Sequence, residues 1–215
     1  MTIPSQSKSA LMQNIWPHFL ILLLAGLVCN GCLSKPSLKT EMFAFQNPPP
    51  AKTTSTSGRV IAVHSVDISA LFNNNSFTYR TGPQSYETDP YANFMASPQE
   101  TIAIAVRAHL RSNGYFKDVV EPGSLVNADE IVDVHVFELY GDFSEPGHAA
   151  AVLSMRISLY RSEAAKGEQL ILQKDYSRRI PLQKNTAAAV MAGWDKALGE
   201  IMTQFTDDLG NGTNR

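Results

Sequence analysis

The chain has few cysteines and no long hydrophobic run. It contains two cysteines in 215 residues, Cys29 and Cys32. Its main apolar stretch, residues 19–29, is well short of the ~20 residues that a helix needs to cross a bilayer. We therefore expect no anchoring by a membrane span. Cleavage before Cys32 would leave a single cysteine, which excludes an internal disulfide.

An excess of positive charge is also missing. Lys and Arg number 18 against 20 Asp and Glu, which gives a formal net charge of −2, and loss of Lys8 with the first 31 residues would make it −3. A surface without a basic field does not attract phosphate backbones. We expect no nucleic-acid partner.

Short catalytic and metal-binding motifs are lacking. The sequence has no G-x-S-x-G elbow and no phosphate-cradling glycine loop. Zinc-site spacing is absent among the five histidines, which are His18, His64, His109, His135 and His148. Asp133 and His135 share one face of a predicted strand, where a solvated pair is more common than a metal or acid–base site. We expect no enzyme, no metal and no cofactor; an enzyme built on these two residues is the weaker alternative.

The N-terminal region has the pattern of an export signal. The apolar run 19–29 has the length of a signal-peptide core, and Gly31-Cys32 behind it resembles the lipobox of bacterial lipoproteins. Residues 1–31 are therefore predicted to be a signal peptide, with Cys32 the lipidated residue. Its acyl chains, palmitate among them, would anchor the protein. Leu33 follows Cys32 in place of an inner-membrane retention Asp, which favours the periplasmic face of the outer membrane; secretion without an anchor and an uncleaved anchor are the alternatives.

Residues 32–57 have the composition of a tether. They contain Pro48-Pro49-Pro50 and the Ser/Thr-rich run 53–57, which favour an extended chain that packs poorly. Residues 42–46 interrupt the tether with an alternating apolar pattern, Met42-Phe43-Ala44-Phe45. This alternation fits either a first edge strand docked on the domain or an apolar patch in the linker.

The remaining pattern predicts one α+β domain over residues 58–209, followed by a disordered tail, 210–215. Alternation predicts strands near 59–68, 132–136, 153–159 and 169–180. Ser97-Pro98 with Glu100 forms a capping box that predicts a helix ending near Gly114, and an apolar stripe predicts a second helix over 185–209. We expect a two-layer fold in which an antiparallel sheet of four to six strands carries both helices on one face.

Residues 71–95 are unusually aromatic for an Asn-, Gly- and Pro-punctuated segment. Tyr and Phe together with Arg are typical anchors of protein contacts. Candidate partner-binding residues are Tyr79, Arg80, Tyr86, Tyr91 and Phe94. Packing of the same rings against the domain's own core is the equally weighted alternative.

These motifs resemble a known family. The string Phe77–Arg80, Tyr86–Tyr91, Phe94 and Ser97-Pro98, together with Glu138–Phe143 and a following Ala-Val-Leu strand, is similar to the auxiliary lipoproteins of ABC-type transporters, including those of paraquat-inducible operons. The resemblance covers about residues 42–209.

The resemblance implies a role and a set of partners. The partners would be a substrate-binding protein with mammalian-cell-entry domains, a permease and an ATPase, which together move lipids or other hydrophobic solutes between the two membranes. The lipoprotein would dock this assembly at the outer membrane without catalysis, with a homo-oligomeric ring as one arrangement. A lipoprotein that itself holds a lipid in a pocket is the alternative from another class.

Overall fold

The computed structural model divides the chain into two units, Met1–Leu38 and Lys39–Arg215. It describes residues 39–46, 56–121, 123–163 and 167–212, all within the second unit. The predicted signal peptide, Cys32 and the proline run of the tether lie outside the described residues.

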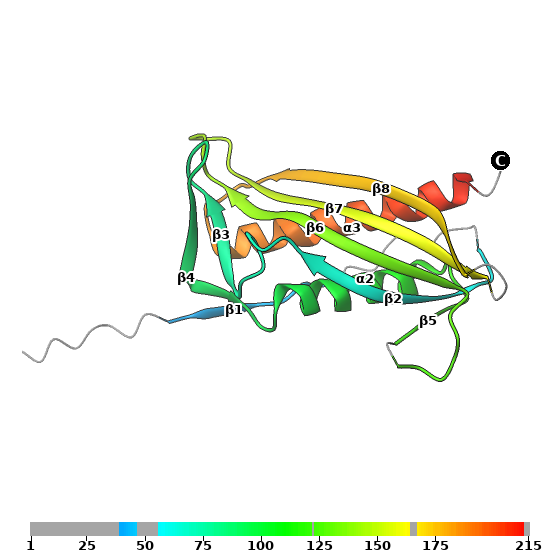
Figure 1. Ribbon diagram of the computed structural model, residues 1–215. Coiled ribbons are helices and arrows are strands. Elements are labelled where there is room, and N and C mark those ends of the chain that lie inside the picture. Colours follow the sequence, from blue (N-terminus) through cyan, green and yellow to red (C-terminus); the bar gives the residue numbers. More distant parts are fainter. Residues whose placement is uncertain (1–38, 47–55, 122, 164–166, 213–215) are drawn as a thin grey trace, which may run out of the picture. The chain divides into compact units, whose positions relative to one another are not determined.

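The described residues form eight strands, which join in one sheet, and two helices that pack on it (Figure 1). In chain order they are β1 (Glu41–Phe43), β2 (Val60–Ile68), β3 (Ser76–Arg80), β4 (Tyr86–Phe94), α2 (Pro98–Asn113), β5 (Asp118–Val120), β6 (Glu130–Asp142), β7 (Ala150–Glu163), β8 (Gly167–Pro181) and α3 (Ala187–Gly212).

Strand β6 organises the sheet. Along one edge it pairs antiparallel with β7, which in turn pairs antiparallel with β8. Along its other edge it pairs parallel with two strands in succession, β2 over its first half and β3 at its last residues. Strand β5 extends the sheet beyond β2, while β4 and then β1 extend it beyond β3.

The observed sheet corrects the predicted one. We expected four to six antiparallel strands, whereas the described residues form eight, and four of their seven pairings are parallel. The segment between β2 and β6 returns the chain to its starting end, so these two strands run parallel. Alternation along a strand reports which side chains face the core but carries no information about the direction of the neighbouring strand. The fold remains α+β overall.

Two missed strands lie in the aromatic segment. Strand β4 is mostly exposed and contains Pro90, features that hide a strand from a search for alternation. Strand β3 is short, at five residues. Both lie at the end of the sheet, where one-sided burial is incomplete.

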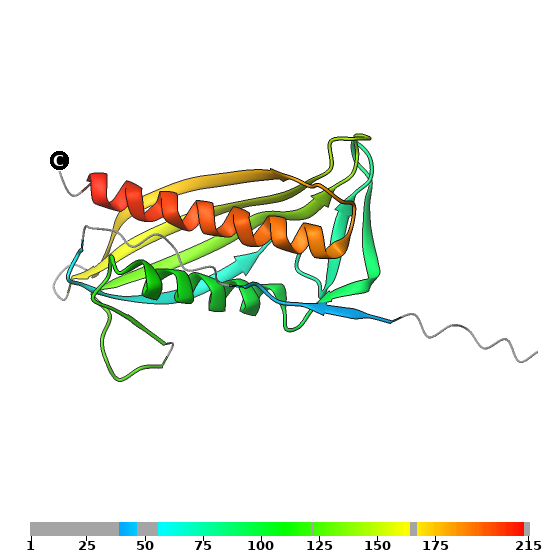
Figure 2. The ribbon, with the colours of Figure 1, turned by 180° about the vertical axis from the view of Figure 1, so that it is seen from behind.

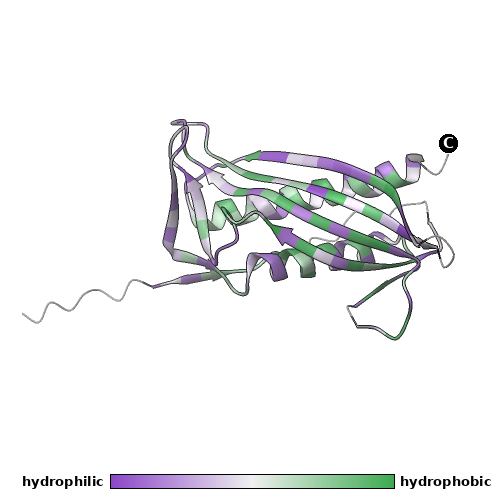
Figure 3. Cartoon of the chain, in the orientation of Figure 1, coloured by the Kyte–Doolittle hydropathy of each residue, from purple (hydrophilic) through white to green (hydrophobic). Residues whose placement is uncertain are grey.

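Both helices cover one face of the sheet (Figure 2). Helix α2 begins at the predicted cap, where Ser97 Oγ accepts the Glu100 N–H at 3.2 Å. It ends before Gly114, whose φ is 78°. Helix α3 buries Trp194 completely, and the indole N–H donates to the Val152 and Tyr140 carbonyls at 3.1 and 3.3 Å. Polar and apolar residues alternate along the long strands (Figure 3), as expected for a sheet with one covered face.

Candidate partner-binding site

The hairpin of β3 and β4 stands at one end of the sheet (Figure 1). It and the segments beside it carry several exposed apolar side chains, and we call this region the aromatic end. The exposed members are Met42, Leu71, Tyr86, Tyr91 and Met95. Exposed large apolar side chains gathered in one region are a feature of protein contact sites.

The five predicted partner-binding residues separate into two groups. Tyr86 and Tyr91 present their rings to solvent, with 46% and 44% of their surface exposed. Phe94 is only 2% exposed, and its ring stacks on Trp194 at 5.7 Å between centroids. Tyr79 and Arg80 are partly buried and hold the hairpin in place. Thus the aromatic segment supplies both core and surface.

Asp89 ties the hairpin together. Its carboxylate accepts the Tyr79 hydroxyl at 2.8 Å and the backbone N–H groups of Tyr91 and Ala92 at 2.8 and 3.2 Å. Burial and then the hydrogen bond to Asp89 raise the pKa of Tyr79 above its usual value. The backbone beneath the Tyr91 ring is therefore held in a fixed geometry.

A buried carboxylate fixes the same end from behind. The Asp142 side chain is fully buried at the end of β6, where it accepts hydrogen bonds from Arg179 at 2.5 Å and from Ser144 Oγ at 2.7 Å, and pairs with Arg80 at 3.0 Å. Burial by itself would raise the pKa of Asp142, but the hydrogen bonds from Ser144 and Arg179 outweigh it and lower the pKa to about 2. These contacts join β3, β8 and the loop after β6.

A chain of rings connects this ion pair to the exposed tyrosine. The Arg80 guanidinium lies 5.7 Å from the Tyr140 ring centroid, and the Tyr140 ring meets Tyr86 edge-on at 5.7 Å. Phe72 packs against both tyrosines. Tyr86 is thus held by packing on its inner side while its outer side stays exposed, and a ring already ordered loses little entropy when a partner binds.

The described residues contain no group of three His, Cys, Asp or Glu side chains placed to hold a metal. His135 is exposed, and Asp133 instead accepts hydrogen bonds from Ser65 and pairs with His64 at 2.9 Å. In the same part of the chain, no helix has both the length and the apolar character that a membrane span requires.

Sequence reasoning missed most of this supporting structure. Arg80 and Arg179 are 62 and 37 residues away from Asp142 along the chain, so no local motif marks the cluster. Among the exposed apolar residues, Met42 lies in β1, within the segment 42–46 that the sequence offers as an edge strand. Leu71 and Met95 stand at the two limits of the aromatic segment 71–95. Position was therefore the one signal that could have found them.

A two-layer α+β domain with a rigid, exposed aromatic end has the features of a binding or assembly domain. The comparison with known families is more specific. The chain belongs to the family described as the ABC-type transport auxiliary lipoprotein component, whose profile matches residues 43–205. This match confirms the resemblance found in the sequence. The family is a transport component and, as lipoproteins, its members are associated with membranes.

Solved structures share the fold. Protein XCC0632 from Xanthomonas campestris, a DUF330 protein, superposes with a TM-score of 0.70 at 13% identity, covering 81% of this chain and 97% of its own. A second, uncharacterized protein superposes with a TM-score of 0.63 at 14% identity, covering 80% of this chain and 99% of its own. No curated protein matches the sequence significantly.

Proposed function

We propose that this chain is the outer-membrane-anchored, periplasmic auxiliary lipoprotein of a mammalian-cell-entry type of ABC transport system for lipids or other hydrophobic solutes. It docks the substrate-binding protein of that system, with its permease and ATPase, and performs no catalytic step. The membership of the family supports the transport role, and the signal sequence with Cys32 supports the anchor.

The observation that carries the docking role is the pair of exposed tyrosines on a rigid base. Tyr86 and Tyr91 are each nearly half exposed, although Asp89 and the Asp142 cluster hold their backbone and inner faces. Aromatic anchors that are already ordered bury large area on binding at low entropic cost. We therefore place the docking surface at the aromatic end.

Photo-crosslinking in cells tests this placement. A benzophenone amino acid replaces Tyr91 in the full-length protein, co-expressed with the proposed mammalian-cell-entry protein, permease and ATPase. The matched control carries it at Ile104, on the outer face of α2 and 48% exposed. Docking at the aromatic end predicts a crosslink to the mammalian-cell-entry protein from position 91 and none from position 104.

Two other crosslinking results would contradict docking of the mammalian-cell-entry protein at the aromatic end. Equal crosslinking from both positions would remove the aromatic end as the docking surface. A product from position 91 at twice the mass of this chain would assign that end to self-association, as in a ring.

A further inference from the structure

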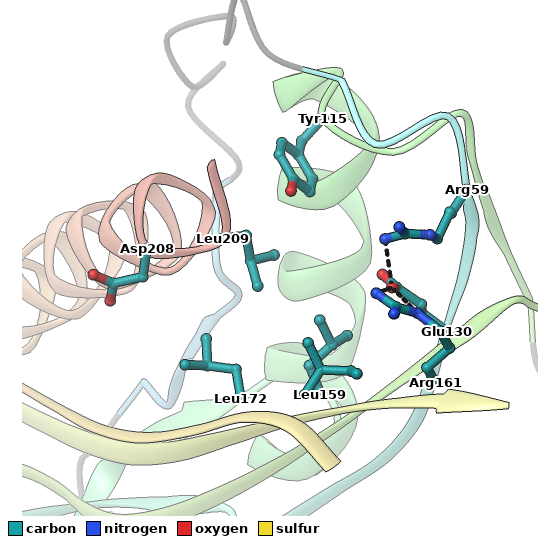
Figure 4. A pocket seen from close by; sticks show the side chains of 9 residues that line it. Arg59, Tyr115, Glu130, Leu159, Arg161, Leu172, Asp208 and Leu209 are labelled. Atoms are coloured by element: carbon teal, nitrogen blue, oxygen red, sulfur yellow. Dashed lines mark hydrogen bonds and ion pairs between the residues drawn. The ribbon is translucent and has the colours of Figure 1, made fainter. Parts of the chain in front are cut away.

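A cleft of about 340 Å³ opens at the other end of β6, away from the aromatic end. Strands β7 and β8, the start of β6 and the last turns of α3 border it (Figure 4). Its volume is at the lower limit of the ~300–1,000 Å³ common for small-molecule sites.

The charged side of the cleft has two guanidinium groups on one carboxylate. Glu130, whose side chain is 2% exposed, accepts hydrogen bonds on Oε1 from Arg59 at 2.9 Å and from Arg161 at 3.0 Å. Each arginine side chain is about one third exposed, at 34% and 32%. One buried negative charge faces two positive charges, so the cluster has a net charge of +1 and guanidinium N–H groups beyond those that Glu130 uses.

The second acid of the cleft does not cancel this charge. Asp208 pairs with Lys174 at 2.7 Å and accepts the Tyr176 hydroxyl at 2.9 Å. Its negative charge is thereby balanced by a lysine on β8. The excess positive charge stays at Arg59 and Arg161.

The opposite side of the cleft is apolar. Leu159, Leu172 and Leu209 line the side of the cleft away from Arg59, and Tyr115 lies above them in the view of Figure 4. Leu159 belongs to the buried core, and Leu172 packs against that core. An apolar wall in the same cleft as partly exposed cations is complementary to a molecule with an anionic head and a hydrocarbon chain.

We propose that this cleft binds a single-chain amphiphile with an anionic head, either a carboxylate or a phosphate monoester. The head lies on Arg59 and Arg161, and the chain lies along Leu159, Leu172 and Leu209. The small volume selects one chain over the two of a phospholipid. This site does not depend on the docking role, because it lies at the opposite end of β6 from Tyr86 and Tyr91.

A photoreactive analogue of dodecanoate tests the proposal on the full-length protein in its membranes. After irradiation, the labelled residues are mapped by mass spectrometry of the digested chain. Labelling is expected at residues of the cleft. Unlabelled dodecanoate and dodecyl phosphate should each reduce the labelling, and their relative strength compares the carboxylate head with the phosphate head. Inorganic phosphate, which has no chain, and dodecyltrimethylammonium, which has a cationic head, should not reduce it.

Three variants make the test specific. Arg161→Gln removes one cation from the cleft and should lower cleft labelling about tenfold or more, because an ion-paired head contributes about that factor. Leu172→Trp fills the apolar side and should lower cleft labelling by a similar factor, because the larger side chain occupies the space of the hydrocarbon chain. Arg156→Gln is the matched control, since Arg156 lies on β7 outside the cleft and pairs with the exposed Asp175, and it should label as the wild type does.

The result can also overturn the proposal. Equal labelling of the wild type and both cleft variants, or equal competition by the cationic amphiphile, would show that the probe reports only nonspecific partitioning. Should Arg161→Gln fail to accumulate as folded protein, Leu172→Trp still decides, because it leaves both arginines in place.

Discussion

Glu130 and Asp142 are single buried residues that link several segments of the fold. Each buried carboxylate lies at one end of β6 and is held by two arginines from other strands or from the segment before β2. Removing one arginine would leave a buried charge with half of its partners, a change that typically costs several kcal/mol. These clusters therefore fix how β2, β3, β7 and β8 meet β6.

His109 is a buried residue of the opposite kind, because its Nε2 has no hydrogen-bond partner among the described residues. Burial lowers its pKa to about 4, against about 6.5 in an unfolded chain. Between these two values the unfolded chain binds more protons, so the free energy of unfolding should fall as the pH drops from 6.5 to 4. The loss is at most about 3 kcal/mol, and His109 adds nothing further below pH 4.

The measurement is chemical denaturation at a series of pH values. His109→Leu should lose this acid-side decline, while His135→Leu, a substitution at an exposed strand position, should keep it. Asp195 acts in the opposite direction, because burial raises its pKa to about 6. The wild-type curve of unfolding free energy against pH therefore contains both contributions. The difference between the wild type and His109→Leu isolates the contribution of His109. A His109→Leu curve parallel to that of the wild type would contradict this account.

Among the elements, α3 approaches the sheet closely at Gly193. A Cβ at this position would lie 2.5 Å from the Ala151 Cβ on β7 and 3.2 Å from Leu182 Cδ2. The helix or the strand would have to shift, because Ala151 has no flexible end to move. Gly193→Ala should therefore lower the free energy of unfolding by about 1–3 kcal/mol, despite the better helix propensity of alanine.

Gly199 on the same helix is the matched control. No atom lies within 4 Å of a Cβ built there. Gly199→Ala should therefore raise the free energy of unfolding by up to about 1 kcal/mol, through helix propensity alone. Thermal or urea denaturation measures both variants. Opposite signs are expected, and a stabilised Gly193→Ala would mean that α3 does not pack on β7 as described.

Elements with local signals could be predicted from the sequence, and those defined by distant contacts could not. The Ser97 cap and the Gly114 stop mark the ends of α2, and the alternation in β6 and β7 marks their buried faces. The parallel pairing of β2 with β6 depends on a connection of more than sixty residues, which leaves no pattern in either strand. In the candidate site, Tyr86 and Tyr91 were found by composition, whereas the exposure of their rings depends on Phe72, Tyr140 and Asp89.

At the scale of the whole molecule, attachment to the membrane is predicted to depend on Cys32, which lies outside the described residues. Acyl chains contribute about 0.8 kcal/mol for each buried methylene, and two or more chains give stable anchoring where one does not. Cys32→Ser should therefore incorporate no labelled palmitate and should move from the membrane to the soluble periplasmic fraction. Cys29→Ser is the matched control and should keep both label and membrane location, because cleavage before Cys32 would remove residue 29 with the signal peptide. Labelled, membrane-bound Cys32→Ser would place the anchor elsewhere in the chain and would separate the outer-membrane assignment from the docking role at the aromatic end.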